Sequence, residues 1–194
     1  DRAAYARLCR LLTLGKRRAE KGACDLAFAD FLDHAAGQAV LALLPEEGGA
    51  DACGTEMAED ALRRHLQAVK AACGDTAWLL AHNLYRGDDA RRLARAAAWA
   101  AESGLDLVAG NDVHYHSPGR RPLQDVLTCI REGCTLAEAG RRLFANAERH
   151  LKPAAEMAAL FRNHPDAVAR TCAVADSCRF SLDELAYEYP REAG

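Results

Sequence analysis

The sequence of 194 residues has few aromatic residues and no excess of positive charge, and both absences limit the fold and the function. Aromatic residues make up 6% of the chain, and the apolar share of 50% is rich in alanine and leucine. This composition favours closely packed helices over an all-β sandwich. The formal net charge of −3 argues against an extended nucleic-acid-binding surface, because neutralising phosphates requires clustered, uncompensated Lys and Arg.

Long apolar runs and closely paired cysteines are also missing. No run approaches the roughly 20 apolar residues that cross a bilayer, and the N-terminus lacks the layout of a signal peptide. We therefore expect a soluble, cytoplasmic protein with no membrane partner. None of the eight cysteines forms a C-x-x-C pair, so free and mostly buried thiols are expected. The chain begins with Asp1 and runs directly into a helical pattern, which suggests that it is a fragment with upstream sequence missing.

The common catalytic and nucleotide-binding motifs are absent. The sequence contains no Gly-x-Ser-x-Gly elbow, no Walker A loop and no G-x-G-x-x-G loop, and no closely placed aspartates of the kind that two-metal nucleotidyl transfer requires. We predict no catalytic residue and identify no nucleic-acid-binding residue. Neighbouring Asp and Glu favour solvated helix faces over phosphate contacts for four arginine pairs: Arg17-Arg18, Arg91-Arg92, Arg120-Arg121 and Arg141-Arg142.

Apolar periodicity and turn residues predict an alternation of helices and strands. Helical spacing covers 5–21, 26–35, 56–72, a long stretch from Asp88 to Gly104, 122–132, a turn at 135–138, 153–161 and 165–178. Short apolar runs at 40–44, 78–82 and 105–109 are typical of buried parallel strands, and 46–55 is expected to be an exposed loop. This order indicates βαβ units, and functional residues are then expected at the carboxyl ends of the strands.

The segment NDVHYH at 111–116 follows the third predicted strand and carries a candidate metal half-site. In an extended chain, Asp112, His114 and His116 point to the same side. A carboxylate and imidazoles at a strand end suit a metal ion. Alternatively, Asp112 and His114 hydrogen-bond each other and cap a loop, which spacing alone favours slightly. His82, at the end of the neighbouring strand, is a further candidate metal ligand, although a lone His there is more often structural.

Several segments, in matching order, resemble the error-prone branch of the C-family bacterial DNA polymerases, which are related to the DNA polymerase III alpha subunit. The resemblance covers nearly the whole chain, to Pro190, and rests on these segments: YARLCRLLTLG at 5–15, LYRGDDARRL at 84–93, NDVHYH at 111–116, RPLQDVLTCIREG at 121–133 and NAERHLK at 146–152.

The resemblance implies an α/β fold: the C-terminal part of a PHP domain, a partial distorted βα barrel with parallel strands over 1–118, followed by a mainly helical segment, 119–194, leading to a polymerase core. Asp112 and His114 match the last ligand pair of the family's metal site, which implies Zn or Mn. His82 is carried over less directly. Pro45-Glu46 stands where metal-competent relatives often have Gly-Cys, so a vestigial site is expected.

The resemblance also implies what the parent protein does and what it meets. An error-prone DNA-directed DNA polymerase, a nucleotidyltransferase of DNA repair and damage tolerance, would use DNA, deoxynucleoside triphosphates and Mg²⁺ in translesion synthesis. The resemblance implies three kinds of partner. They are the protein's own polymerase core, which would pack on the helical segment, a sliding clamp, and mutagenesis accessory proteins. The fragment alone is expected to be inactive.

Two other functions remain open from the sequence. The chain could belong to a stand-alone, metal-dependent PHP phosphoesterase, or it could be a non-catalytic structural module whose helices from Pro122 onward bind a partner. The sequence beyond Gly194 and a metal analysis of the longer protein would discriminate among the three.

Overall fold

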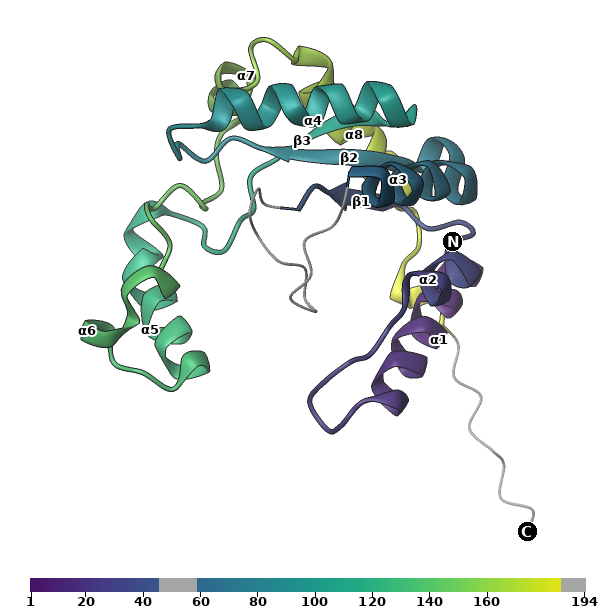
Figure 1. The fold of residues 1–194 in the computed structure, drawn as a ribbon, viewed down its shortest axis with the longest axis horizontal. Coiled ribbons are helices and arrows are strands. Elements are labelled where there is room, and N and C mark those ends of the chain that lie inside the picture. The colour runs from purple at the N-terminus through teal and green to yellow at the C-terminus, as the bar shows by residue number, and fades with distance from the viewer. Residues whose placement is uncertain (46–58, 186–194) are drawn as a thin grey trace.

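The fold combines a small parallel sheet with helices on its faces and flanks (Figure 1). The structure is a computed structural model, and it describes residues 1–45 and 59–185. The predicted loop at 46–55, Cys53 and the start of the predicted helix at 56–58 lie outside the described residues.

The three predicted strands form one parallel sheet in the order β1-β2-β3. Strand β1 is Val40–Leu43, β2 is Ala77–His82 and β3 is Asp106–Gly110. Helix α3, Glu59–Cys73, precedes β2, and α4, Asp89–Ser103, connects β2 to β3. The predicted βαβ order is therefore confirmed, and the three strands deliver their carboxyl ends to the same edge of the sheet.

The main core lies between the sheet and helices α3 and α4. Leu79, at the centre of β2, has no exposed surface, and it clusters with Leu66 of α3 and Trp99 of α4. The prediction that all three strands are buried was wrong for β1. Leu41 and Leu43 are 42% and 57% exposed, because they alternate with Val40 and Ala42, which pack against the core, and so point to the other face of β1.

Helix α4 is held at both ends by short-range contacts. The carboxylate of Asp89 accepts hydrogen bonds from the backbone amides of Leu84, Arg86 and Gly87, so it fixes the loop that leads into the helix. Asp88 is the residue before the helix but makes no side-chain cap. Gly104 ends the helix with φ of 70°, a left-handed conformation that glycine adopts without a steric penalty.

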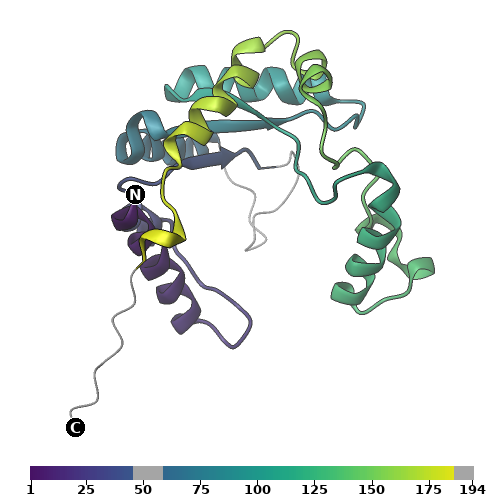
Figure 2. The same cartoon turned by 180° about the vertical axis from the view of Figure 1, so that it is seen from behind.

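The C-terminal helices return to the sheet and cover the free edge of β3. Helix α7 is Ala154–Leu160 and α8 is Pro165–Ser177, and Figure 2 shows α8 lying across the sheet. Arg170 of α8 donates to the carbonyl of Leu107 in β3 and pairs with Asp106. Phe161, between the two helices, is completely buried in the main core. The division of the chain at residue 118 stays a prediction.

The remaining helices flank this central layer. Helices α1, Arg2–Arg18, and α2, Phe28–His34, lie at one end, and α5, Arg121–Glu132, and α6, Leu136–Ala139, lie at the other (Figure 1). Helix α1 ends at Arg18 and not before Gly22 as predicted, since Ala19 is already extended. The described residues also form four single-turn 3-10 helices: Gly74–Thr76, Pro118–Arg120, Gly140–Arg142 and Leu182–Glu184.

The seven described cysteines are free thiols, as predicted, but most of them are not buried. Cys129 is buried, whereas Cys9, Cys24, Cys172 and Cys178 are exposed, because they lie on the outer faces of peripheral helices and loops. None of the described helices combines the length and apolar character that crossing a bilayer requires.

Candidate functional site

A polar cavity of about 320 Å³ lies at the carboxyl edge of the sheet, where the sequence predicted the functional residues. Pro45 follows β1, His82 ends β2 and Asp112 follows β3, and all three line this cavity. Gly110 leaves room for the side chains of Leu80 and His82, because a Cβ atom at this position would lie 2.6 Å from Leu80 and 3.0 Å from the His82 ring. The parallel sheet thus explains why residues distant in sequence meet.

Asp112 is held in an uncommon backbone conformation beside a cationic partner. Its φ is +43°, in the left-handed region that Asp tolerates better than most residues. The extended 112–116 segment that the sequence predicted is therefore bent at its start. Oδ2 of Asp112 lies 2.5 Å from Nε of Arg149, and Oδ1 lies 3.5 Å from Nε2 of His114. The expected proximity of Asp112 and His114 is confirmed.

The charge of Arg149 controls the ionisation of Asp112. Burial raises the pKa of the Asp112 carboxyl, but the hydrogen bond and charge of Arg149, together with the charges of His82 and His114, hold this pKa below its ordinary value. Asp112 is therefore a carboxylate at neutral pH, and a guanidinium already neutralises it.

Arg149 is fixed by contacts on several sides. Its side chain is 12% exposed, and its guanidinium carbon lies 3.9 Å from the centre of the Phe144 ring, a cation–π contact. Its carbonyl accepts hydrogen bonds from the amides of His114 and Tyr115. The ring of His114 packs edge-on against the same Phe144. The segment around Arg149 is thus attached to the end of β3.

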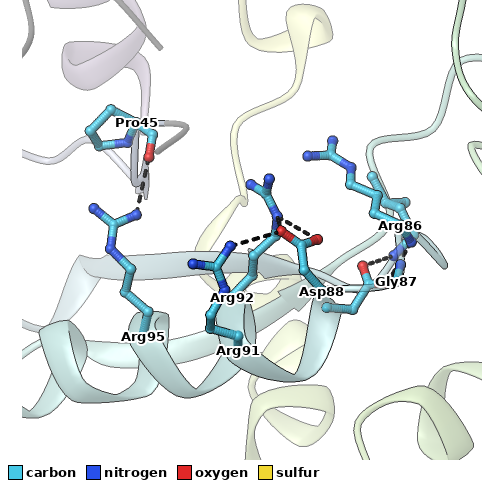
Figure 3. Close-up of polar contacts among 9 residues, drawn as sticks. Pro45, Arg86, Gly87, Asp88, Arg91, Arg92 and Arg95 are labelled. Carbon is cyan, nitrogen blue, oxygen red and sulfur yellow. Dashed lines mark hydrogen bonds and ion pairs between the residues drawn. The ribbon is translucent and has the colours of Figure 1, made fainter. Parts of the chain in front are cut away.

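Arginines, more than metal ligands, dominate the cavity. Arg86, Arg92, Arg95 and Arg149 all line it. Arg92 pairs with Asp88, and Arg95 donates to the carbonyl of Pro45, as Figure 3 shows. Sequence reasoning missed Arg86, Arg95 and Arg149, and interpreted Arg92 as part of a solvated pair. Helical spacing of Arg92 and Arg95 was the signal that could have placed these two on one face.

The metal assignment of Asp112, His114 and His82 stays a prediction, and the donors that the described residues bring to the cavity fit a divalent cation poorly. Asp112 contributes one negative charge, which Arg149 already neutralises at 2.5 Å. Like charges repel, and three further guanidinium groups share the cavity. A metal ion bound to Asp112 would displace Arg149 from this carboxylate. The Arg149 guanidinium would then remain partly buried without a carboxylate partner, which costs free energy.

A second group of side chains with metal-binding atoms includes the two sequence neighbours of Arg149, which lines the cavity. Ligand atoms of Glu148, His150 and Glu156 all lie within 4.8 Å of one another. The fully buried ammonium group of Lys152 pairs with the Glu148 carboxylate at 3.1 Å and also donates to the Glu148 carbonyl. This ammonium already supplies a positive charge beside Glu148, so we assign no metal ion to the group.

Comparisons with known proteins identify close relatives over nearly the whole chain. No known family profile matches the chain. It is 52% identical over 99% of its length to a protein named error-prone DNA polymerase from Bradyrhizobium sp. (strain ORS 278), and 45% identical over 99% to one of that name from Caulobacter vibrioides. A protein of the same name from Brucella abortus is 46% identical. The chain spans only about 16% to 17% of the length of these relatives. It is therefore homologous to a segment of such proteins.

Proposed function

We propose that this chain is a segment of a bacterial error-prone DNA-directed DNA polymerase, in which it forms part of a PHP-type βα barrel with a vestigial metal site. One observation carries the proposal: 52% identity over 99% of the chain to a protein of that name. The parallel sheet and its polar carboxyl edge support the βα barrel assignment. The segment acts as a scaffold, and the nucleotidyl transfer takes place elsewhere in the parent protein.

The contacts of Asp112 support the vestigial character of the metal site. A working Zn or Mn site needs several anionic or imidazole ligands facing one ion. Here the guanidinium of Arg149 already pairs with Oδ2 of Asp112, and an alternative role for Asp112, orienting Arg149 and His114, accounts for its position. We therefore expect Asp112, His114 and His82 to contribute to folding and to hold no resident metal.

The parent protein would extend primers on damaged templates in the cytoplasm, with Mg²⁺ and deoxynucleoside triphosphates, and would meet a sliding clamp and mutagenesis accessory proteins. Primer extension across an abasic template site by the full-length protein tests this directly. The full-length protein is expected to extend the primer past the lesion. Failure to extend even an undamaged primed template would contradict the proposal.

Removing the candidate ligands tests the vestigial site separately. The variants Asp112→Ala and His114→Ala of the full-length protein are expected to keep the wild-type content of Zn and Mn, measured by elemental analysis, and to keep primer extension. The physical reason is that Arg149, not a metal ion, neutralises Asp112. Stoichiometric metal that is lost in either variant, or a metal-dependent phosphoesterase activity that disappears with it, would instead favour a working PHP site.

The exposed face of α5 supports packing on the rest of the polymerase. Leu123, Val126, Leu127 and Ile130 recur at helical spacing and are 41% to 71% exposed. An apolar stripe of this kind is typical of a helix that packs on a partner. Because the relatives are about six times longer than this chain, the occupant we propose is the polymerase core of the same polypeptide.

The substitution Ile130→Asp tests this contact. It is expected to release the α5 region in the full-length polymerase, because a charge cannot be buried at an apolar contact without a partner. Limited proteolysis should then cut near α5 faster than in wild type. The matched control Arg131→Ala changes the charge by the same amount at an exposed neighbouring position and should leave the cutting rate unchanged. Equal cutting of wild type and Ile130→Asp would contradict the packing.

A further inference from the structure

We propose that Cys129 and Cys134 form a dithiol site, which a small disulfide such as oxidised glutathione converts reversibly into a disulfide bond. The site lies where α5 ends and the chain turns into α6 (Figure 1). Both residues are free thiols in the structure. This inference does not depend on the polymerase assignment, because it rests on the contact between the two side chains.

The backbone at the end of α5 brings the two cysteines together. Gly133 has a φ of +63°, and its amide donates to the carbonyl of Ile130. The amide of Cys134 donates to the carbonyl of Cys129 at 3.0 Å. These two hydrogen bonds define a Schellman motif, in which the residue after the glycine commonly packs on the residue five positions before it. The side chains that meet in this motif are usually apolar, and here they are two thiols.

The hydrogen bond between Cys134 and Cys129 also keeps these residues within the reach of a disulfide. A backbone N–H···O bond of 3.0 Å limits the separation of their Cα atoms to about 7 Å, which is the greatest separation that a disulfide spans. Rotation of the two side chains is then enough to join the sulfur atoms. The fold of the α5 terminus therefore does not have to change for the bond to form.

The ionisation of Cys129 reports the contact between the thiols. Burial, followed by the charge and the hydrogen bond of Cys134, raises the pKa of the Cys129 thiol. The charge of Asp125 adds to this increase, and the charge of Arg142 opposes it. At Cys73, burial is the cause of the raised pKa. The contribution of a second thiol therefore sets Cys129 apart from Cys73.

The two thiols differ in their access to solvent. Cys129 is only 6% exposed, whereas Cys134 is partly exposed in the turn beyond the helix. Both line a cavity of about 470 Å³ between α5 and α6, a volume within the range of small-ligand pockets. Cys134 lies outside the apolar stripe of α5, so packing of that stripe on the polymerase core leaves this thiol reachable. A small disulfide therefore meets Cys134 first.

The exchange takes place in two steps. The Cys134 thiolate attacks one sulfur of oxidised glutathione, the S–S bond of glutathione breaks, and one glutathione leaves as a thiolate. The Cys129 thiolate then attacks the Cys134 sulfur, so that the protein disulfide forms and the second glutathione leaves. The departing thiolates take up the protons that the cysteines released, and two electrons pass from the protein to glutathione. After the first step Cys134 carries no charge, which removes one cause of the raised pKa of Cys129.

Trypsin digestion and mass spectrometry of the full-length protein test the proposal, because Arg131 lies between the two cysteines. Cleavage there places Cys129 in peptide 121–131 and Cys134 in peptide 132–141, so a disulfide joins two separate peptides. The joined peptides are expected to accumulate when oxidised glutathione at about 0.1 mM is added, and to disappear in an excess of reduced glutathione. Free thiols are alkylated before digestion. Absence of the joined peptides in oxidised wild type would overturn the proposal.

Substitutions separate the two steps. In Cys129→Ala, glutathione bound to Cys134 should accumulate about tenfold over wild type, because a neighbouring thiol acts at an effective concentration of roughly millimolar or more. In Cys134→Ala, the buried Cys129 should stay unmodified. The matched control Cys178→Ala removes an exposed thiol and should leave the amount of joined peptides unchanged. Equal amounts of glutathione on Cys134 in wild type and Cys129→Ala, modification of Cys129 in Cys134→Ala, or loss of the joined peptides in the control would each contradict the site.

Discussion

The substitution Phe161→Ala is expected to lower the free energy of unfolding by about 4 kcal/mol, the largest effect that we expect of a single substitution. Phe161 follows α7, has no exposed surface and belongs to the core formed by the sheet and helices α3 and α4. Removing its ring takes apolar area out of that core and leaves a cavity that the fixed strands cannot fill by moving.

Urea unfolding followed by circular dichroism measures this loss. The control Leu151→Ala removes an apolar side chain that is 62% exposed, and the expected change is within about 0.5 kcal/mol. If Phe161→Ala behaved like this control, the C-terminal helices would not be part of the main core. A single cooperative transition that shifts as a whole would show that the segment beyond residue 118 and the sheet unfold together.

The substitution Arg149→Met is expected to lower the free energy of unfolding by about 2 kcal/mol at neutral pH. Methionine keeps much of the apolar stem of Arg149 but removes the cation that neutralises Asp112 and stacks on Phe144. The loss is smaller than for a fully buried pair, because the Asp112 side chain is 36% exposed and water partly solvates it. The control Arg131→Met, at an exposed position, should have no measurable effect.

The pH dependence of the Arg149→Met variant provides an independent readout. Because Arg149 lowers the pKa of Asp112 in the folded state, the stabilisation is complete above the ordinary carboxyl value of 3.8 and is lost as the pH falls through the lower folded value. Wild type should therefore lose stability in this acidic range more steeply than Arg149→Met. Parallel stability profiles for the two proteins would show that Arg149 does not control the ionisation of Asp112.

The regular elements were predicted well because their signals are local. The apolar runs at 40–44, 78–82 and 105–109 became the three strands, and a glycine after Ser103 ended α4 where expected. Errors arose where the outcome depends on neighbours. The exposure of Leu41 and Leu43 depends on what covers their face of β1, which no pattern within β1 encodes.

The candidate site was predicted in location but not in character. The order of strands and helices was enough to place Pro45, His82 and Asp112 at one edge, since parallel strands end on the same side. The partner of Asp112 is Arg149, 37 residues away. No spacing rule connects these two residues, so the neutralising cation and the arginine-lined cavity could not be read from the motif NDVHYH.

The sequence by itself determined the helices, the strands and the proximity of Asp112 to His114, because each depends on residues a few positions apart. The order of strands and helices along the chain was enough to indicate the parallel sheet. Only the tertiary structure decided that Arg86, Arg92, Arg95 and Arg149 meet in one cavity. The physical reason is that the sign of the charge at a site is a sum over side chains from separate segments, and folding alone brings those segments together.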